Sequence, residues 1–429
     1  AALIIAPKGV YRNWEKQEIP IHMPEHVNYK TVVWSPNKTK KQAKILETLF
    51  KHDEELVIFL MNIEAFSTKT GSRFAEKFLL SHRTLMAIDE STTIKSSTAS
   101  RTKNILKLRD LAKYRRILTG SPVTKSPLDL YTQCYFLDPY LLDFQSYYSF
   151  KSRYAIIKRQ NMGSHSFDQI VGYQRLDELN HKLNQFSFRV LKKDCLDLPE
   201  KVYTKRYVTM TKEQKQIYDQ MRDHALTFLQ SGEVITATSA LAQMIKLHQI
   251  TCGHVTTEVE ENDIRIQEIP NNRIKVLNEA LEEVDGKVII WATYVHDIRK
   301  IEQSLKEKYG TKAVETFYGG TASDDRQEIV TRFQDKEDDL RFLIANPRVG
   351  GYGLTLTASH TVIYYSNNYD LEIRMQSEDR THRIGQTNKV TYIDLMVEKT
   401  VDELIIKSLR NKINLASQVL GEEFKEWLV

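Results

Sequence analysis

Short runs of apolar residues recur along the chain, and the stretches between them are long enough to form helices. Four runs lie in the first 120 residues: Leu3–Ala6, Leu56–Leu60, Thr84–Asp89 and Arg115–Gly120. Four more lie within residues 287–396: Lys287–Thr293, Phe342–Asn346, Thr361–Tyr365 and Val390–Met396. Such runs, separated by helical patterns, are typical of parallel strands covered on both faces. The pattern predicts an α/β protein with two parallel-sheet lobes.

The segment between these two groups has no clear strand pattern. Residues Tyr131–Arg153 are rich in aromatics, and Thr211–Leu247 carries apolar residues at helical spacing. Both stretches predict helical insertions between the lobes. The acidic stretch Glu258–Glu268 predicts an exposed loop before the second lobe.

Composition narrows the class of protein. No apolar run approaches the roughly eighteen residues of a membrane span, which excludes a transmembrane protein. The 21 Tyr and 16 Phe residues exclude a disordered chain. Cys134, Cys195 and Cys252 lie far apart, which argues against a disulfide scaffold or zinc ribbon and fits a reducing interior. The formal charge of +5 permits a nucleic-acid partner but does not require one.

The first residues, AALIIAP, have no basic region and no cleavage site of a signal peptide. They predict a buried strand that Pro7 ends. Because the chain opens inside this strand, we expect the natural N-terminus to lie upstream.

An acidic pair, Asp89 and Glu90, follows the third predicted strand. The carboxyl ends of parallel strands border the crevice where α/β sheets bind ligands. In phosphate-loop NTPases an Asp at this place holds Mg²⁺, and an adjacent Glu can polarise the attacking water. The alternative is a solvated helix N-terminus, which acidic residues also favour.

Thirty residues later, LTGSP places Thr119, Gly120 and Ser121 at another strand end. The glycine permits a tight turn, and the two hydroxyls lie at the same sheet edge. A plain turn is the alternative, since Gly-Ser-Pro suits one well.

Two further motifs lie in the second lobe. Gly350, Gly351 and Gly353 follow a predicted strand and would let the backbone approach a phosphate, although a flexible loop has the same composition. Arg380 and Arg383 are three residues apart, so on a helix they would project from one face and reach a phosphate. A surface salt-bridge patch is the alternative for the arginines.

Taken in order, DEST, LTGSP, GGYGLTLTAS and QSEDRTHRIGQ resemble the motifs of the SWI/SNF ATPase family of DNA translocases, in helicase superfamily 2. The flanking sequences LIIAPKGVYRNWEKQ, NIEAF and LPEKVYTKRYVTMTKEQKQIYDQM also resemble that family. The resemblance covers the chain from Leu3 to about Lys412.

The resemblance implies two RecA-like parallel-sheet lobes with helical insertions between them. The implied domains are residues 1–127 (first lobe), 128–195 (its helical insertion), 196–270 (linker and insertion of lobe two) and 271–429 (second lobe with a closing brace helix). In the family, ATP binds in the cleft between the lobes.

The resemblance also implies roles for individual residues. Asp89 would coordinate Mg²⁺ and Glu90 would activate water. Arg380 and Arg383 would be arginine fingers. Such a finger contributes about 10³–10⁵ to the hydrolysis rate of NTPases. Gly351, Gly353 and Gln376 would line the nucleotide site. Thr119, Gly120 and Ser121 would couple the state of the nucleotide to the nucleic-acid face.

Double-stranded DNA is the implied partner, held mostly through its phosphates, which position a protein without specifying sequence. The implied contacts are Lys8, Asn62, Lys95, Thr293 and Thr355. The stretch Lys95–Arg116 holds eight basic residues and one acid, Asp110, which suits a groove that follows the DNA backbone. A solvated helix face is the alternative.

Three departures from the family pattern stand out. No Gly-x-x-x-x-Gly-Lys-Ser/Thr loop is present in the 429 residues, so we expect this chain to hydrolyse ATP poorly by itself. Thr92 stands where many superfamily members have His. Thr355 stands where the family usually has Asn.

Two other functions remain open: a strand-separating superfamily 2 helicase and a catalytically inactive nucleic-acid-binding module. The helical insertion and the Leu-Pro-x-Lys linker favour the translocase, and the intact remaining motifs favour an enzyme. A protein bound to DNA is a possible further partner, and a membrane is not expected. We expect a bacterial or viral protein of the cytoplasm, or a nuclear one if the host is eukaryotic.

Overall fold

The computed structural model describes residues 1–8, 10–36, 39–51, 55–162, 165–230, 237–260, 263–350 and 354–421. The strands are β1 (Ala2–Ala6), β2 (Tyr29–Val33), β3 (Leu56–Asn62), β4 (Leu85–Asp89), β5 (Tyr114–Leu118), β6 (Ala155–Met162), β7 (His165–Tyr173), β8 (Lys201–Tyr207), β9 (His254–Glu260), β10 (Asp263–Glu268), β11 (Lys287–Trp291), β12 (Val314–Phe317), β13 (Phe342–Ala345), β14 (Ser359–Tyr364) and β15 (Val390–Met396).

The α-helices are α1 (Tyr11–Asn13), α2 (Ile19–His22), α3 (Lys40–Glu47), α4 (Lys69–Ser81), α5 (Ser100–Leu108), α6 (Leu130–Leu137), α7 (Tyr147–Tyr154), α8 (Leu176–Asn184), α9 (Lys192–Cys195), α10 (Lys212–Gln230), α11 (Ala237–Cys252), α12 (Arg273–Glu282), α13 (Val295–Tyr309), α14 (Ser323–Gln334), α15 (Pro347–Gly350), α16 (Leu371–Glu378) and α17 (Val401–Leu420). A π-helical segment, η1 (Trp14–Glu18), joins α1 to α2. The 3₁₀ segments are η2 (Thr48–Phe50), η3 (Ile63–Ser67), η4 (Ser91–Ile94), η5 (Arg109–Leu111), η6 (Pro127–Asp129) and η7 (Thr311–Ala313).

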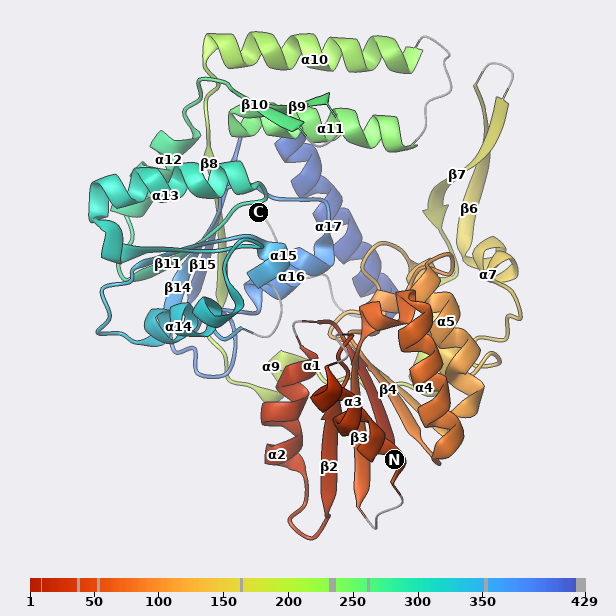
Figure 1. Cartoon of the computed structure of the whole chain (residues 1–429). Coiled ribbons are helices and arrows are strands. Elements are labelled where there is room, and N and C mark those ends of the chain that lie inside the picture. The colour runs from red at the N-terminus through yellow and green to blue at the C-terminus, as the bar shows by residue number, and fades with distance from the viewer. Residues whose placement is uncertain are drawn as a thin grey trace. The chain divides into compact units, whose positions relative to one another are not determined.

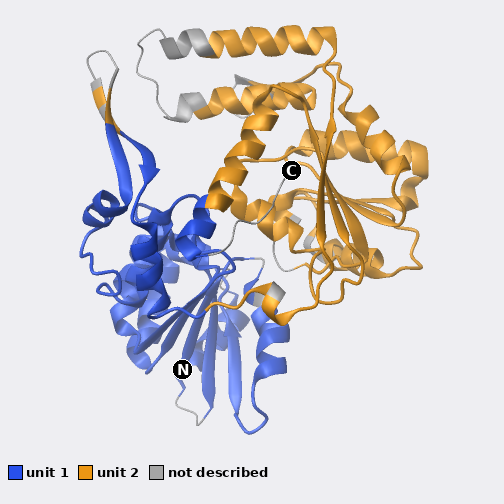
Figure 2. Ribbon diagram, turned by 180° about the vertical axis from the view of Figure 1, so that it is seen from behind, with its two compact units in different colours: residues 1–158, 169–188, 415–423 blue, residues 159–168, 189–414, 424–429 orange. Residues whose placement is uncertain are grey.

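The chain divides into two compact units, coloured separately in Figure 2. Unit 1 comprises residues 1–158, 169–188 and 415–423, and unit 2 comprises residues 159–168, 189–414 and 424–429. Each unit contains one large parallel sheet with helices in its crossover connections, as Figure 1 shows.

The sheet of unit 1 has five parallel strands in the order β2-β3-β1-β4-β5. Alternate residues of β1 enter different apolar clusters: Leu3 and Ile5 pack with α4 and α5 residues, whereas Ile4 packs on the other face. Burial on both faces explains why β1 has a continuous apolar sequence. The edge strand β5 differs, because Tyr114 is 48% exposed and Leu118 is 44% exposed. The prediction of a strand here is therefore confirmed, but the prediction that the strand is buried is wrong.

The sheet of unit 2 has six parallel strands in the order β12-β13-β11-β14-β15-β8. Its two faces are also separate apolar clusters, with Val288 and Ile290 on one and Ile289 and Trp291 on the other. The predicted α/β class with two parallel sheets is confirmed.

The middle of the chain contains strands that the sequence pattern did not predict. β8 pairs in parallel with β15 along its whole length, from Lys201 to Tyr207. Its sequence, KVYTKRY, mixes three charged residues with β-branched and aromatic ones, and so lacks the continuous apolar run of the central strands. β6 and β7 form a separate two-stranded ribbon, which extends away from α7 in Figure 1.

The acidic stretch Glu258–Glu268 is not a loop. β9 and β10 form an antiparallel hairpin across it, with Thr256 opposite Ile266. β-branched residues such as these favour extended backbone, and acidic residues are compatible with the solvated face of an antiparallel pair. The acidic composition therefore indicated exposure and not an irregular loop.

Candidate active site

The carboxylate of Asp89 lies at the carboxyl end of β4, where its two oxygens receive different donors. Oδ1 accepts the backbone N–H of Glu90 at 2.9 Å, and Oδ2 accepts the indole N–H of Trp14 at 2.8 Å. Burial raises the pKa of Asp89 above its usual range, the two hydrogen bonds act in the opposite direction, and the charge of Glu18 adds to the rise.

Glu90 has a left-handed backbone conformation, with φ 51° and ψ 59°. Residues other than glycine rarely adopt it, at a cost of order 1–3 kcal/mol, and such strain clusters at functional sites. Thr93 holds the conformation, because its N–H and its hydroxyl both donate to the carbonyl of Glu90, at 2.9 and 2.8 Å. The chain thereby turns sharply from β4 into η4.

Gln133, on α6, joins the two motifs of unit 1. Its side-chain oxygen accepts the hydroxyl of Ser91 at 2.7 Å, and its amide nitrogen donates to the carbonyl of Pro122 at 2.9 Å. Lys95 makes a second link by donating to Thr124 Oγ1 at 2.7 Å. The structure therefore brings DEST and LTGSP together. The sequence analysis missed Gln133, whose signal was an amide within a mainly apolar and aromatic helix.

The LTGSP turn itself is held by short-range bonds. The N–H of Ser121 donates to Thr119 Oγ1 at 3.2 Å, and the hydroxyl of Ser121 donates to the carbonyl of Val123 at 3.3 Å. Gly120 is exposed. These bonds define a turn, and Thr119 and Ser121 lie at the end of β5 beside the end of β4.

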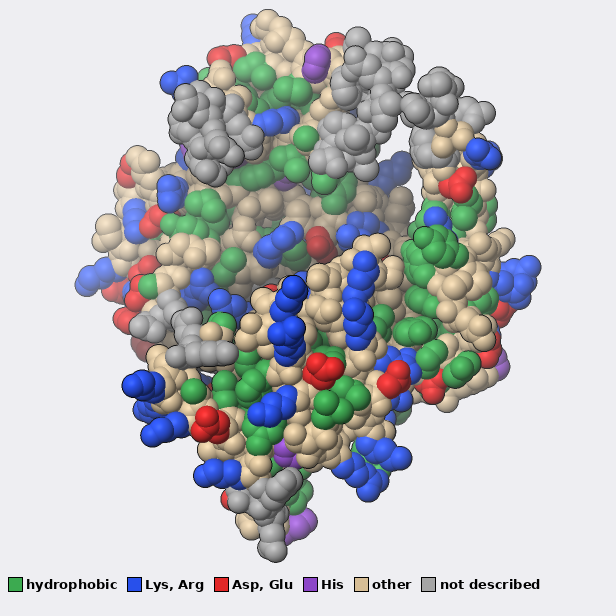
Figure 3. Space-filling model, turned by 45° about the vertical axis from the view of Figure 1, so that its right-hand side comes forward, with side chains coloured by type: hydrophobic (Ala, Val, Ile, Leu, Met, Phe, Trp, Pro, Cys, Tyr) green, Lys and Arg blue, Asp and Glu red, His purple; other side chains and the backbone are tan. Residues whose placement is uncertain are grey.

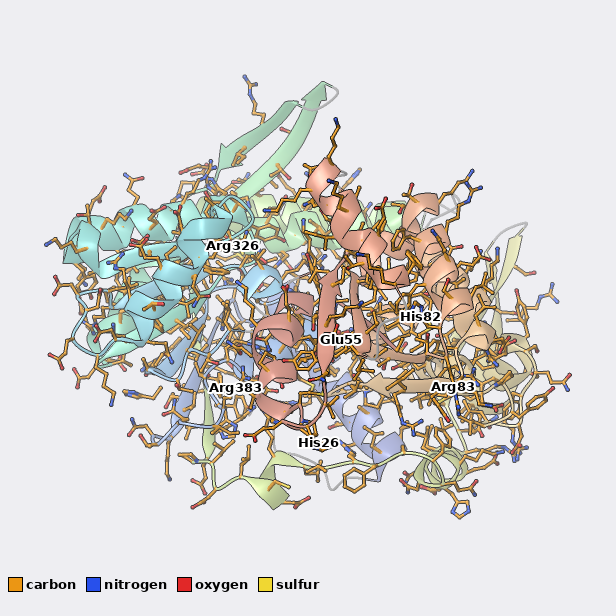
Figure 4. The ribbon with its side chains drawn as sticks, turned by 60° about the horizontal axis from the view of Figure 1, so that its bottom comes forward. His26, Glu55, His82, Arg83, Arg326 and Arg383 are labelled. Carbon is orange, nitrogen blue, oxygen red and sulfur yellow. The ribbon has the colours of Figure 1, made fainter. Side chains whose placement is uncertain are left out.

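In unit 2, Arg380 and Arg383 converge on one backbone group. Arg380 donates from Nη1 to the carbonyl of Leu354 at 3.3 Å, and Arg383 reaches the same oxygen at 3.5 Å. Leu354 directly follows the glycine motif. Arg383 is labelled in Figure 4.

The prediction that these arginines share a helix face is wrong, because α16 ends at Glu378. The carbonyl of Glu378 accepts the hydroxyls of Thr381 and Tyr392, each at 3.0 Å. The N–H groups of Thr381 and His382 also donate to this carbonyl, each at 3.2 Å. The N–H of Arg380 donates to the carbonyl of Ser377 at 3.4 Å, in a bond that spans three residues, so the chain leaves α16 through a tight turn before Arg383. The arginines meet through this turn and not through helical periodicity.

Gln376 lies on α16 next to this pair. Its carbonyl accepts Arg380 Nε at 2.8 Å, and its side-chain Oε1 is buried without a hydrogen-bond partner among the described residues. Gly351 and Gly353 lie outside the described residues. An unpaired buried acceptor beside two guanidinium groups is able to receive a donor from a ligand.

A buried network missed by the sequence analysis fixes α16. Arg374 donates to Glu378 Oε1 at 2.8 Å and to Asp394 Oδ2 at 3.2 Å. Lys201 and Tyr203 of β8 donate to the other oxygen of Glu378, at 2.9 and 2.8 Å. Burial alone would raise the pKa of Glu378, but Lys201 and Arg374 lower it to about 2. The network ties α16 to β15 and β8.

The predicted DNA contacts differ in their surroundings. Lys8 is exposed, and Thr355 is half-buried. Asn62 donates to Glu64 Oε2 at 2.9 Å. Thr293 is fixed by Ser366, because its N–H donates to Ser366 Oγ at 2.9 Å and its hydroxyl donates to the carbonyl of Ser366 at 3.2 Å.

The basic stretch Lys95–Arg116 has two kinds of residue. Arg109 and Arg115 are internal ties, since Arg115 Nε donates to the carbonyl of Leu137 at 2.7 Å and Arg109 is 5% exposed. Lys103 and Lys107, on α5, are exposed. Figure 3 shows Lys and Arg side chains in several separate groups on the face that it draws. The surface charge of this stretch is therefore smaller than its sequence indicates.

Asp89 has the chemistry that Mg²⁺ requires, because each of its oxygens keeps a lone pair beyond the hydrogen bond described above. Within the described ranges no cluster of three or more His, Cys, Asp or Glu side chains could hold a metal ion. Asp89 therefore suits an ion that takes most of its ligands from water and phosphate. No helix in the described part of the chain is long and apolar enough to cross a membrane.

Comparison with known proteins agrees with these motifs. Residues 1–255 match the SNF2-related domain, and residues 272–385 match the helicase conserved C-terminal domain. An uncharacterised ATP-dependent helicase of Mycoplasma genitalium is 25% identical over 98% of this chain and 37% of its own length. A putative ATP-dependent helicase/translocase of Bacillus subtilis is 25% identical over 98% of this chain and 43% of its own length.

A solved SWI2/SNF2 ATPase core of Sulfolobus solfataricus, in complex with double-stranded DNA, is 26% identical and covers 98% of this chain and 82% of that chain, with a TM-score of 0.39. The present chain spans less than half the length of the two helicase relatives. The SNF2-related match covers more than half of the chain, and so the chain belongs to the SNF2-related family of helicase-like ATPases.

Proposed function

We propose that the chain is the motor part of an ATP-dependent translocase on double-stranded DNA. The observation that carries the proposal is the convergence of Arg380 and Arg383 on the carbonyl of Leu354, directly after the glycine motif. Two guanidinium groups at one point form a site for the charge of a transferring phosphoryl group.

The acidic pair of unit 1 supplies the other half of the chemistry. Asp89 would hold Mg²⁺ through its free lone pairs, and the bound ion would supply positive charge to the phosphates of ATP. Glu90 orients and polarises the attacking water. Arg380 and Arg383 stabilise the charge that develops on the phosphoryl oxygens.

The turn at Thr119, Gly120 and Ser121 carries the nucleotide state to the nucleic-acid contacts. Gln133 supports this role, because it links Ser91, next to the acidic pair, to Pro122, next to the turn. A change at Asp89 or Glu90 then reaches the LTGSP turn through one buried side chain.

DNA is bound through its phosphates by Lys8, Asn62, Lys95, Thr293 and Thr355. Binding is therefore independent of sequence and steeply dependent on salt, with log affinity falling by about 0.9 per phosphate contact for each unit of log salt on duplex DNA. A flat salt response, or a strong preference for one duplex sequence, would contradict this binding mode. Tighter binding of single strands than of duplex would favour the strand-separating helicase.

The test of the ATPase compares Arg383→Ala with Glu90→Gln. Turnover is measured with and without duplex DNA, in the 429-residue chain and in any longer natural form of the protein. Both variants should lose turnover, Arg383→Ala by on the order of 10³-fold. Arg383→Lys is the matched variant, since it keeps the charge and removes the forked donor.

The two variants should differ in how they hold nucleotide. Glu90→Gln keeps the phosphate contacts and should retain ATP together with DNA. Arg383→Ala should leave the binding of nucleotide to unit 1 almost unchanged but fail to draw the units together, as read by a distance probe on each unit. Near-normal turnover in Arg383→Ala would refute the catalytic role. DNA binding without turnover in every form would favour an inactive binding module.

A further inference from the structure

Trp14 makes a contact that the proposed mechanism does not use. Its indole Nε1–H donates to Asp89 Oδ2 at 2.8 Å, although the two residues are 75 positions apart in sequence. The other carboxylate oxygen is held by the N–H of Glu90 at 2.9 Å. Two donors therefore set the orientation of the carboxylate, and of these only the indole belongs to a side chain.

An unusual helix segment brings the indole to this place. Trp14 is the first residue of the π-helical segment η1, which lies between α1 and α2. A π-helical turn holds one residue more than an α-helical turn, is rare, and is often found at functional sites. The added residue changes the direction in which the side chains before and after it project.

Both ends of this segment are anchored. Tyr11 is 9% exposed and Ile19 is 6% exposed, and both pack in the apolar cluster beneath β1 and β3. Across the segment, Asn13 Nδ2 donates to Glu18 Oε1 at 3.2 Å. The indole is therefore presented to Asp89 from a fixed backbone.

We propose that Trp14 is a positioning residue for Asp89, and that it holds the carboxylate in the orientation in which the carboxylate binds a divalent cation. The inference rests on the proposed role of Asp89 as a cation ligand. Carboxylate ligands of metals are commonly held by hydrogen bonds from residues behind them, and loss of such a partner typically costs about 10–100-fold in metal affinity. Trp14→Phe removes the donor and keeps an aromatic ring.

The contact itself is tested by NMR of indole N–H groups. The chain has four Trp residues, so four resonances are expected, and Trp14→Phe identifies the resonance of Trp14 by its loss. Asp89→Asn replaces a charged acceptor by a neutral one and should shift that resonance upfield. The resonance of Trp34, in the core of the same unit, should stay in place. If Trp14→Phe fails to fold, Trp34→Phe, Trp291→Phe and Trp427→Phe identify the other three resonances and leave that of Trp14 by elimination, so the shift in Asp89→Asn can still be read.

Cation binding is tested with Mn²⁺ alone, since carboxylates that suit Mg²⁺ also suit Mn²⁺. Paramagnetic Mn²⁺ should broaden the Trp14 resonance of the parent chain before those of Trp34 and Trp291. Free Mn²⁺ measured by electron paramagnetic resonance should show half-saturation at about 10-fold or higher concentration in Trp14→Phe. Trp34→Phe is the matched control and should bind Mn²⁺ like the parent.

The outcomes are distinct. An unmoved Trp14 resonance in Asp89→Asn, or unchanged Mn²⁺ affinity in Trp14→Phe, overturns the inference and leaves the proposed function in place, because that function is measured by DNA-stimulated turnover. Equal Mn²⁺ binding by the parent and by Asp89→Asn overturns the inference together with the proposed cation role of Asp89. A shifted resonance and a weakened affinity confirm the inference.

Discussion

Two charged arginine side chains are buried in unit 2. Arg374 is 2% exposed and Arg273 is fully buried. Each is neutralised by a carboxylate, Asp394 for Arg374 and Asp402 for Arg273, and each makes further hydrogen bonds. Buried charges are tolerated only with such complete partners, and removing one partner leaves the other uncompensated. Single residues therefore decide the stability of the elements around them.

Arg374→Met should destabilise unit 2 by about 3–5 kcal/mol, because Glu378 and Asp394 would remain buried without the guanidinium group that bonds to both. Urea denaturation, followed by the fluorescence of Trp291, measures the change. Arg222→Met is the matched control, since Arg222 is half exposed and pairs with Asp219 and Asp223 on the surface. It should cost less than about 1 kcal/mol. Equal losses in the two variants would contradict this account of the network.

His248 predicts a dependence of stability on pH. Burial lowers the pKa of His248 from 6.5 to about 4, although Asp402 acts in the opposite direction. Because the folded pKa lies below the unfolded one, the neutral form belongs to the native state. The contribution of the neutral imidazole to the free energy of unfolding is fully present above about pH 6.5. Up to roughly 3 kcal/mol of it is lost as the pH falls toward 4.

His248→Gln should flatten this part of the pH profile, because glutamine keeps hydrogen-bonding capacity toward the Tyr294 hydroxyl, now 2.8 Å from Nδ1, and does not titrate. The free energy of unfolding measured between pH 7 and pH 4 reports the difference. The depressed pKa of Glu378 contributes in a lower window, between about 4.5 and 2. An unchanged slope in His248→Gln would show that another group causes it.

The basic residues of helix α5 are of two kinds: some are exposed, and one makes an internal hydrogen bond. Its exposed lysines, Lys103 and Lys107, face solvent, whereas Arg101 donates from Nε to the carbonyl of Thr93 at 2.9 Å and holds the turn after the acidic pair. Thr102 and Ile105 on the other face are buried in the unit 1 core. The element is amphipathic, and only its outer row of lysines is available to a nucleic acid.

Lys103→Gln combined with Lys107→Gln should weaken duplex binding equally for all sequences and reduce the salt slope by about 2, since each phosphate contact contributes close to 0.9. Fluorescence anisotropy at several salt concentrations measures both quantities. Lys275→Gln with Lys312→Gln makes the same change of charge at exposed positions of unit 2. If the control pair lowers the slope by as much, α5 has no special part in DNA binding.

The whole molecule consists of two units, each with its own sheet and its own apolar clusters. Chains of this kind commonly unfold in more than one step. His248 and Glu378, whose pKa values are lowered to about 4 and about 2, both lie in unit 2. The two units should therefore respond differently to acid.

We expect two thermal transitions, reported separately by Trp34 in unit 1 and Trp291 in unit 2, each buried in its own core. Lowering the pH from 7 to 5 should move the Trp291 transition to lower temperature by more than the Trp34 transition. Variants in which Trp34 or Trp291 is the single remaining tryptophan separate the signals. Coincident transitions at both pH values would mean that the units unfold as one body.

Much of the fold followed from local patterns. Strands β1, β3, β4, β11, β13, β14 and β15 were predicted because each is a continuous apolar run, which needs no knowledge of its partners. Strand β5 was also predicted, although its exposure was not. Strands β2, β8 and β12 escaped prediction because they are edge strands, and only the neighbouring strand explains their polar residues. The hairpin β9–β10 was mistaken for a loop because acidity indicates exposure and says nothing about backbone pairing.

The sequence by itself determined the family and the order of the chemical motifs, because these are carried by residue identities at short spacing. The tertiary structure decided what those residues touch. Trp14 meets Asp89 across 75 positions, and Gln133 joins Ser91 to Pro122 across 42 and 11 positions. Arg380 and Arg383 converge on the carbonyl of Leu354 through a turn after α16, which ends at Glu378, and no helical periodicity could reveal that turn. Contacts between residues distant in sequence depend on the packing of the sheets, and only the folded chain contains that information.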